Sequence, residues 1–208
     1  VRGINLFHSF SEFNIDDRQR VYFGNPSGVE NIFSRITGNS ASNIFGTLGV
    51  DGNANLFFIN PNGILFGENA SLDIGGSFVG TTANEVGFGE QGVFSASNPQ
   101  APPLLTIEPN LLRFNRFNRN AAIQNNSRVF AGQNLSGGGA FGLRVPDGKS
   151  LLLLGGNVSM IGGGLNAFGG RVEFGGLAEA GTVGLDINGD IFGLVFPDGL
   201  ERANIFLT

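Results

Sequence analysis

Residues 55–67 read Asn-Leu-Phe-Phe-Ile-Asn-Pro-Asn-Gly-Ile-Leu-Phe-Gly. Two short apolar runs, 56–59 and 64–66, flank a break of four turn-forming residues. The stretch therefore predicts a strand, a tight turn and a second strand. Both runs are apolar at successive positions, so the two strands are expected to be buried on both faces, as strands of parallel sheets are.

The break itself specifies the turn through three side chains. Asn60 can cap the turn with its side-chain oxygen, and Pro61 presets φ at the second turn position. Gly63 tolerates the positive φ that often ends such a turn. A two-residue hairpin is the simplest alternative, but Pro61 has no N–H to donate to the ladder of an antiparallel pair.

Composition favours a fold of many short strands with tight corners. A chain of 208 residues that is 41% hydrophobic and 14% charged can bury a large core, and its length suits one or two domains. The counts of 35 Gly and 21 Phe are unusual. Without a Gly-X-Y period, this glycine content excludes collagen, and the abundant Phe, Leu, Ile and Val argue against disorder.

Charge and cysteine content exclude several classes of function. A net charge of −5 without a cluster of Lys or Arg argues against nucleic acid as a partner. The absence of Cys excludes disulfides, thiol chemistry and Cys-ligated metals. The densest basic stretch predicts a solvated loop, with stacking on RNA as the less favoured alternative, and consists of Arg113, Arg116, Arg119 and Arg128.

No segment of the sequence has the pattern of a membrane span or a secretory signal. No apolar run approaches the roughly 18 residues that a spanning helix needs. The chain opens inside a patterned region, so an exported protein would have lost its signal before this point.

A weak repeat in the second half indicates a solenoid. The apolar run 151–154 precedes a Gly-Gly pair at Gly155, and the run 171–174 precedes another at Gly175, which gives an offset of 20 residues. The scarcity of helix formers excludes ankyrin and TPR repeats, and the missing Leu/Asn frame excludes leucine-rich repeats. A parallel β-helix fits, with three short strands per coil and inward stacks of aliphatic and Phe side chains.

We expect a single domain over residues 1–208. Within it we expect a cap region over 1–50, an excursion from the main body over 84–118 in the form of a hairpin, and regular coils over 121–208.

The turn motif, the upstream run 6–10 and the downstream run 75–78 together resemble a known family. The chain is similar to the N-terminal secretion domain of filamentous-haemagglutinin-type exoproteins of two-partner secretion systems, from Asn5 to about Ala83. The Asn-Pro-Asn-Gly-Ile signature of that family is unaltered at Asn60, Pro61, Asn62, Gly63 and Ile64. Its companion Asn-Pro-Asn-Leu motif is present only in altered form, as Asn25, Pro26, Ser27 and Gly28.

The resemblance implies an all-β fold, a right-handed parallel β-helix with an N-terminal strand cap. It also implies a secreted or cell-surface exoprotein that is exported through the periplasm and the outer membrane. The implied partner is an outer-membrane β-barrel transporter whose periplasmic domains recognise this segment, after which β-helix folding starts at the cell surface. The candidate recognition or fold-nucleating residues are Asn60, Pro61, Asn62, Gly63, Ile64, Asn25 and Pro26.

Whether the transporter contacts these side chains or the turn only supports the fold stays open, and structural support is the favoured interpretation. Two other functions stay as alternatives. A carbohydrate-binding adhesin would contact glycans, although the chain has no Trp and a single Tyr for sugar stacking. A polysaccharide-acting β-helix enzyme would need clustered carboxylates, whereas the Asp residues are scattered beside Gly and indicate turns. We therefore expect no enzyme activity and no cofactor.

Two further patterns have a structural interpretation. His8 lies beside Ser9, but adjacent strand residues point to opposite faces, so a structural histidine is favoured over a catalytic pair. Asp186, Asn188 and Asp190 resemble the start of a calcium loop, but Ile191 stands where such a loop needs Gly. A turn between strands is the expected structure there.

Overall fold

The computed structural model describes residues 1–101, 103–115 and 121–208. Arg116, Arg119 and the last part of the expected excursion, 116–118, lie outside the described residues. The described chain is built from β-strands, with a short 3₁₀ helix, η1 (Gly89–Gln91). Within the described residues, no helix is long and apolar enough to cross a membrane.

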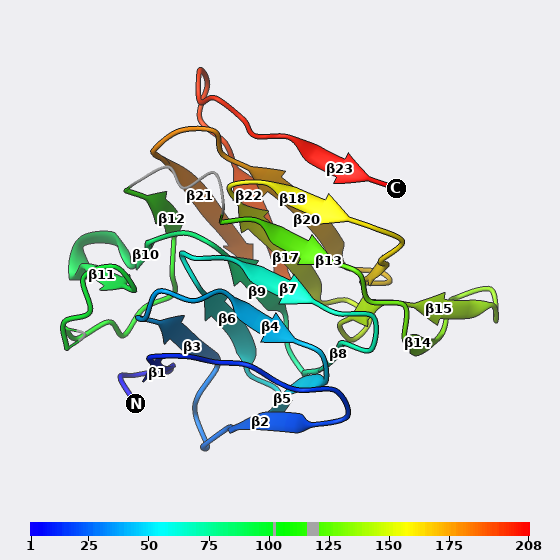
Figure 1. The fold of residues 1–208 in the computed structure, drawn as a ribbon. Helices are drawn as coiled ribbons and strands as arrows, with labels where there is room; N and C mark the ends of the chain where they lie inside the picture. The colour runs from blue at the N-terminus through cyan, green and yellow to red at the C-terminus, as the bar shows by residue number, and fades with distance from the viewer. Residues whose placement is uncertain (102, 116–120) are drawn as a thin grey trace.

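Three parallel ladders of strands form the body of the molecule (Figure 1). The first sheet contains, in spatial order, β1 (Asn5–Phe10), β3 (Asn31–Ile36), β6 (Asn55–Ile59), β9 (Phe78–Thr81), β17 (Ser150–Gly155) and β20 (Arg171–Gly176). The second sheet contains β4 (Ser42–Ile44), β7 (Ile64–Phe66), β13 (Ile123–Asn125), β18 (Val158–Met160) and β23 (Ile205–Leu207). The third ladder consists of β2 (Arg20–Gly24), β5 (Thr47–Asp51) and β8 (Ser71–Asp73), followed by the pair β16 (Leu143–Arg144) and β19 (Leu165–Asn166).

Each passage of the chain through the three ladders makes one coil, and each coil stacks on the previous one in parallel register. The register pairs Asn5 with Asn31 and Leu56 with Phe78, so these coils take 26 and 22 residues. The second sheet rises in Figure 1 from β4 near the N-terminal end to β23 at the C-terminal end. The expected all-β fold with stacked parallel sheets, a parallel β-helix, is confirmed.

The structure corrects the sequence repeat by one residue. Gly155 pairs with Gly176 and Leu151 pairs with Val172, so the offset of this coil is 21 residues and not 20. A shift of one residue moves every side chain of a strand to the opposite face. The Gly-Gly pairs look equivalent in sequence, but the alternation of inward and outward side chains determines the register.

The alternating residues of the first sheet belong to two separate cores. Leu56 and Phe58 point into the β-helix and pack in the inner core, whereas Phe57 and Ile59 pack in a second, outer core. All four side chains are fully buried. The predicted burial of this strand on both faces is therefore confirmed, and it requires a second layer over the first sheet.

An antiparallel sheet outside the β-helix supplies this layer, and we call it the cover sheet. In spatial order it contains β11 (Val93–Ser95), β10 (Glu85–Gly87), β12 (Leu111–Phe114), β21 (Gly181–Asn188) and β22 (Ile191–Val195). Strands β10, β11 and β12 lie in the segment where the excursion is expected. A separate hairpin, β14 (Phe130–Gln133) and β15 (Gly139–Phe141), projects from the body (Figure 1). The fold class therefore includes small antiparallel sheets beside the coils.

The N-terminal end of the stack is filled by aromatic side chains. Strand β1 continues the first sheet in parallel register with β3. The rings of Phe10, Phe13 and Phe23 contact one another, with centroids 5.3 to 6.2 Å apart, and Phe13 also meets the Phe58 ring at 5.1 Å. These contacts cover the interior of the first coil, where no preceding coil lies beneath it.

Candidate functional site

The turn at Asn60–Gly63 connects β6 to β7, at the corner where the chain passes from the first sheet to the second. The backbone N–H of Gly63 donates to the Asn60 carbonyl over 3.1 Å, which closes a four-residue turn. The Asn60 side-chain oxygen accepts from the Asn62 backbone N–H at 2.9 Å. The predicted cap on the turn is therefore confirmed.

Asn60 is fully buried, and the neighbouring coil uses the rest of its amide. Its Nδ2 donates to the Ser40 carbonyl and to Ser42 Oγ, both over 3.0 Å. Its Oδ1 also accepts from Asn62 Nδ2 at 3.0 Å, and the same Asn62 nitrogen donates to the Gly38 carbonyl at 2.8 Å. A single turn therefore ties its own coil to the loop of the preceding coil.

Gly63 has the positive φ that the sequence predicts, at +123°. A Cβ at this position would lie 3.1 Å from the Ala122 carbonyl oxygen of the next coil. The carbonyl of Gly63 accepts from Ser42 N in the preceding coil, and Ile64 N donates to Ala122 in the next. Both the backbone conformation and the spacing of coils therefore favour glycine here.

Ile64 and Pro61 differ in their environment. Ile64 is buried in the inner core, where β7 lies between β4 and β13. Pro61 is half-buried at the outside of the corner. Of the five signature residues, Pro61 and Asn62 are the ones that keep partial contact with solvent.

Asn25 and Pro26 form a second turn, at a different corner of the coil. They lie between β2 and β3, where the chain passes from the third ladder to the first sheet. Asn25 Nδ2 donates to the Val29 carbonyl at 2.9 Å, and its Oδ1 accepts from Ala54 N at 3.0 Å in the next coil. Asn25 is half-buried and Pro26 is exposed. The structure therefore gives the two turns similar hydrogen bonding but does not bring them together.

A ladder of asparagines, which the sequence analysis missed, begins three strands of the first sheet. Asn31 Nδ2 donates to Asn5 Oδ1 at 3.1 Å, and Asn55 Nδ2 donates to Asn31 Oδ1 at 2.9 Å. The Ser77 backbone N–H then donates to Asn55 Oδ1 at 2.8 Å. A signal was available, because each asparagine begins an Asn-(Leu/Ile)-Phe triplet, at 5–7, 31–33 and 55–57.

The family described as the TPS secretion domain matches residues 1–206. The chain belongs to this family. This family is the N-terminal two-partner secretion domain, and the proteins that carry it are secreted exoproteins. A comparison with curated proteins finds no match.

The TPS secretion domain places His8 in the aromatic cluster at its N-terminal end. The imidazole lies 5.2 Å from the Phe23 ring, and its Nε2 is buried without a hydrogen-bond partner among the residues described. Burial, followed by the charge of the N-terminal amine, lowers the pKa of His8. Ser9 points to the outer face and accepts from Arg35 Nε at 2.7 Å. The prediction that the two neighbours face opposite sides is confirmed.

Acidic and basic residues of the TPS secretion domain take structural positions. The turn expected near Asp190 is a tight hairpin from Asn188 to Ile191, and the Asp190 carboxylate pairs with Lys149 at 2.6 Å. Arg113 lies in β12 and pairs with Glu85 at 3.2 Å, so it is not in the expected loop. In the part of the chain that the structure describes, no three His, Asp or Glu side chains are grouped so that they could hold a metal ion.

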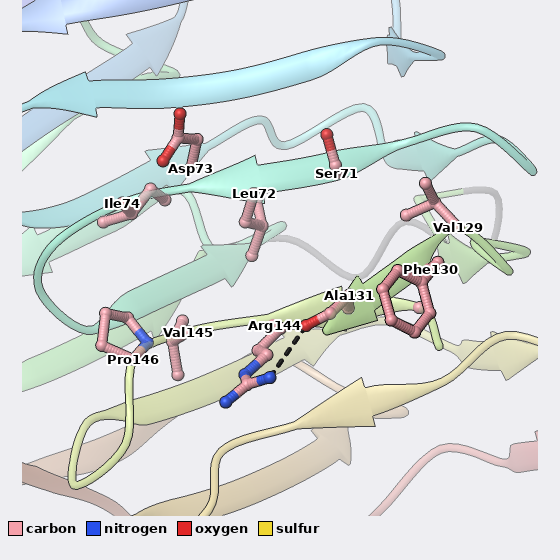
Figure 2. A pocket seen from close by; sticks show the side chains of 11 residues that line it. Ser71, Leu72, Asp73, Ile74, Val129, Phe130, Ala131, Arg144, Val145 and Pro146 are labelled. Atoms are coloured by element: carbon pink, nitrogen blue, oxygen red, sulfur yellow. Dashed lines mark hydrogen bonds between the residues drawn. The ribbon is translucent and has the colours of Figure 1, made fainter. Parts of the chain in front are cut away.

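A shallow groove of about 260 Å³ lies where the third ladder is interrupted, between β8 and β16 (Figure 2). Leu72 points into it from β8, and Arg144 lies on the opposite side, where it donates to the Ala131 carbonyl at 2.9 Å. Phe130 of the projecting hairpin lies at one end and is 61% exposed. This combination of an exposed aromatic ring and a partly apolar groove is a second candidate site for contact with another molecule.

Proposed function

We propose that this domain is the segment through which a cognate outer-membrane β-barrel transporter recognises an exoprotein, and that it then nucleates β-helix folding at the cell surface. Membership of the TPS secretion family over residues 1–206 is the observation that carries this proposal. The contacting parts of the partner are its periplasmic domains, which meet the chain before it folds. The domain acts by being recognised and by folding, and it performs no catalysis.

The burial of the signature turn supports a role in folding for Asn60 and Gly63. In the folded domain Asn60 has no exposed surface, and its amide is bonded to residues 38–42 of the preceding coil through itself and Asn62. A partner that binds the folded domain would have to unfold this corner to contact Asn60. We therefore assign the turn a role in the nucleation of coils. If the transporter contacts these side chains, it does so before the chain folds.

Stacked coils suit a chain that folds as it leaves a pore. Each new coil buries apolar side chains against the previous one, so folding can start at one end and proceed through neighbour contacts. The turn at Asn60 bonds the corner between β6 and β7 to the start of β4 and the loop before it, so it ties its own coil to the preceding one. Coils that have formed outside oppose the return of the chain, since they would first have to unfold.

Export of a fused passenger tests the proposal. We expect Asn60→Ala and Gly63→Val to reduce export strongly. Matched controls are Asn39→Ala, at an exposed asparagine, and Gly24→Val, at an exposed glycine with open space around its Cβ position. Unchanged export of both turn variants would remove the turn from the mechanism.

Binding to the periplasmic domains of the transporter separates recognition from folding. We expect the denatured chain to be captured and the folded chain to be captured weakly or not at all. Asn60→Ala should leave capture of the denatured chain unchanged if the turn acts only in folding. Tight capture of the folded domain, with loss of capture in Asn60→Ala, would contradict this division of roles.

Contact with a carbohydrate is a second candidate function, and the groove beside Phe130 is the observation that favours it. An exposed aromatic ring next to a shallow groove can stack on a sugar ring. Saturable binding of a glycan by the wild-type domain, lost in Phe130→Ala, would support this function. An enzyme is the least favoured candidate, because Asp73, Asp147 and Asp190 each bond a neighbouring Tyr, Arg or Lys side chain.

A further inference from the structure

Strands β21 and β22, residues 181–195, complete the cover sheet, and we call them the strap. In an ordinary solenoid each repeat contacts only its neighbours, so stability is a sum of local terms. Here β12 pairs with β21, so Leu111 lies opposite Gly184 and Arg113 opposite Thr182. The cover sheet therefore joins two segments that lie about seventy residues apart in the sequence.

Polar side chains of the first sheet bond the cover sheet and its adjoining loop to the coils, both at the N-terminal end of the stack and at its other end. At the N-terminal end, Asn5 Nδ2 donates to the carbonyls of Leu105 and Ile107 over 2.9 and 2.7 Å. Arg35 donates to the carbonyls of Ser95 and Gln100 over 2.7 and 2.9 Å. These contacts hold the segment that carries β11 and the loop after it against the first two coils.

The strap is fastened at the other end of the same face. The hydroxyls of Ser77 and Ser150 donate to the Asp190 carbonyl over 3.1 and 3.3 Å, and Ser150 Oγ accepts from Phe192 N at 2.9 Å. Glu173 of β20 accepts from Leu194 N at 2.6 Å. Because Ser77 N donates to Asn55, the asparagine ladder runs without interruption from Asn5 to the strap.

Apolar contacts follow the same path. The rings of Phe7, Phe33 and Phe57 stack along the outer face of β1, β3 and β6, with centroids 5.2 and 4.5 Å apart. Phe192 of the strap continues this row at 6.0 Å from Phe57. Val183 of the strap is fully buried in the same outer core. The strap therefore packs against the Phe57 ring, which belongs to a coil far from the strap in the sequence.

We propose that the strap is a closing clamp, which converts a stack of coils with neighbour contacts into one cooperative unit. All six strands of the first sheet precede residue 181, so the clamp closes only after this sheet is complete. The clamp adds a locking step to the proposed function, and its role in export rests on that function. A chain that emerges N-terminus first would have coils that open singly until the strap arrives, and would be locked afterwards.

Native-state hydrogen exchange on the full chain tests the clamp, with two matched substitutions. Val183→Ala shortens a fully buried strap residue, and Val158→Ala shortens an equally buried residue of β18 in the inner core. Under the proposal, Val183→Ala speeds exchange of the β3 and β6 amides about tenfold, by the same factor as those of β20. While the strap is intact, Val158→Ala should likewise speed exchange in β3 and β6, because a cooperative unit opens as a whole. In a Ser150→Ala background, which weakens the strap, the effect of Val158→Ala should be confined to β13, β23 and the adjoining coils.

Two results would overturn the clamp. One is faster exchange in Val183→Ala that stays within the cover sheet, β17 and β20. The other is an effect of Val158→Ala that has the same spread whether the strap is intact or weakened, since the strap would then have no special role. If Val183→Ala does not fold, Ser150→Ala removes the link to Asp190 and Phe192 with a smaller loss of packing, and the same comparison applies. The transporter is not used, so the outcome is independent of the proposed secretion function.

Discussion

Replacing Asn60 with alanine should destabilise the domain more than any other change of one polar side chain in the two turns. The Asn60 side chain makes four hydrogen bonds, two as donor and two as acceptor, at 2.9 to 3.0 Å. A typical hydrogen bond contributes about 1 kcal/mol net, and a buried group that is left without a partner costs more. Because the residue has no exposed surface, water cannot replace the lost partners without opening the corner. We expect a loss of about 2 to 4 kcal/mol for Asn60→Ala.

Asn25→Ala is the matched comparison. Asn25 also bonds its own turn and the next coil, but it is half-buried, so water can reach the groups that lose their partner. We expect a loss of about 1 kcal/mol for this variant. Urea unfolding followed by far-ultraviolet circular dichroism measures both values, since the chain has no Trp for fluorescence. The midpoint should fall while the slope of the transition stays constant.

Asn60→Asp refines the same test. The variant keeps the oxygen that accepts from Asn62. It replaces the nitrogen that donates to the Ser40 carbonyl by a carboxylate oxygen, so two acceptors face each other. We expect it to be less stable than Asn60→Ala at pH 7 and to recover part of this loss at pH 4, where the carboxyl group can be protonated and donate. A loss under 1 kcal/mol for Asn60→Ala, or equal losses for Asn60→Ala and Asn25→Ala, would refute the reasoning from burial.

Two further predictions concern ionisable groups at the N-terminal end, the half-buried His8 and the buried Arg35. Burial lowers the pKa of His8, so the unfolded chain binds a proton at a higher pH than the folded chain does. Stability should therefore fall as the pH drops below about 6.5, and His8→Leu should remove that part of the dependence in urea titrations at pH 5 and pH 7.5; an unchanged pH profile would contradict this. Arg35 is 5% exposed, and no carboxylate among the described residues forms an ion pair with it. We expect Arg35→Lys to lower the unfolding midpoint more than Arg35→Met, because lysine keeps a buried charge but cannot donate to Ser9, Ser95 and Gln100 together; the reverse order would disprove it.

Local chemistry accounts for what could be predicted at the candidate site. The turn at Asn60–Gly63, its cap and the positive φ of Gly63 depend on neighbouring residues, so the sequence predicted them correctly. The burial of residues 56–59 on both faces of the strand could be predicted, because apolar residues do not alternate with polar ones in this run. The full burial of Asn60 could not, since its partners Ser40 and Ser42 come from another coil.

By itself, the sequence determined the coil as a unit: short apolar strands, corners built from Asn, Pro and Gly, and enough recurrence to indicate parallel stacking. Tertiary structure decided how the coils align and what covers them. The offset of 21 residues follows from which side chains face inward, and the pairing of β12 with β21 joins segments that share no sequence pattern. The physical reason is that a turn is determined by residues within a few positions, whereas the cover sheet forms only because the outer face of the first sheet carries apolar rings and polar groups that need partners from elsewhere in the chain.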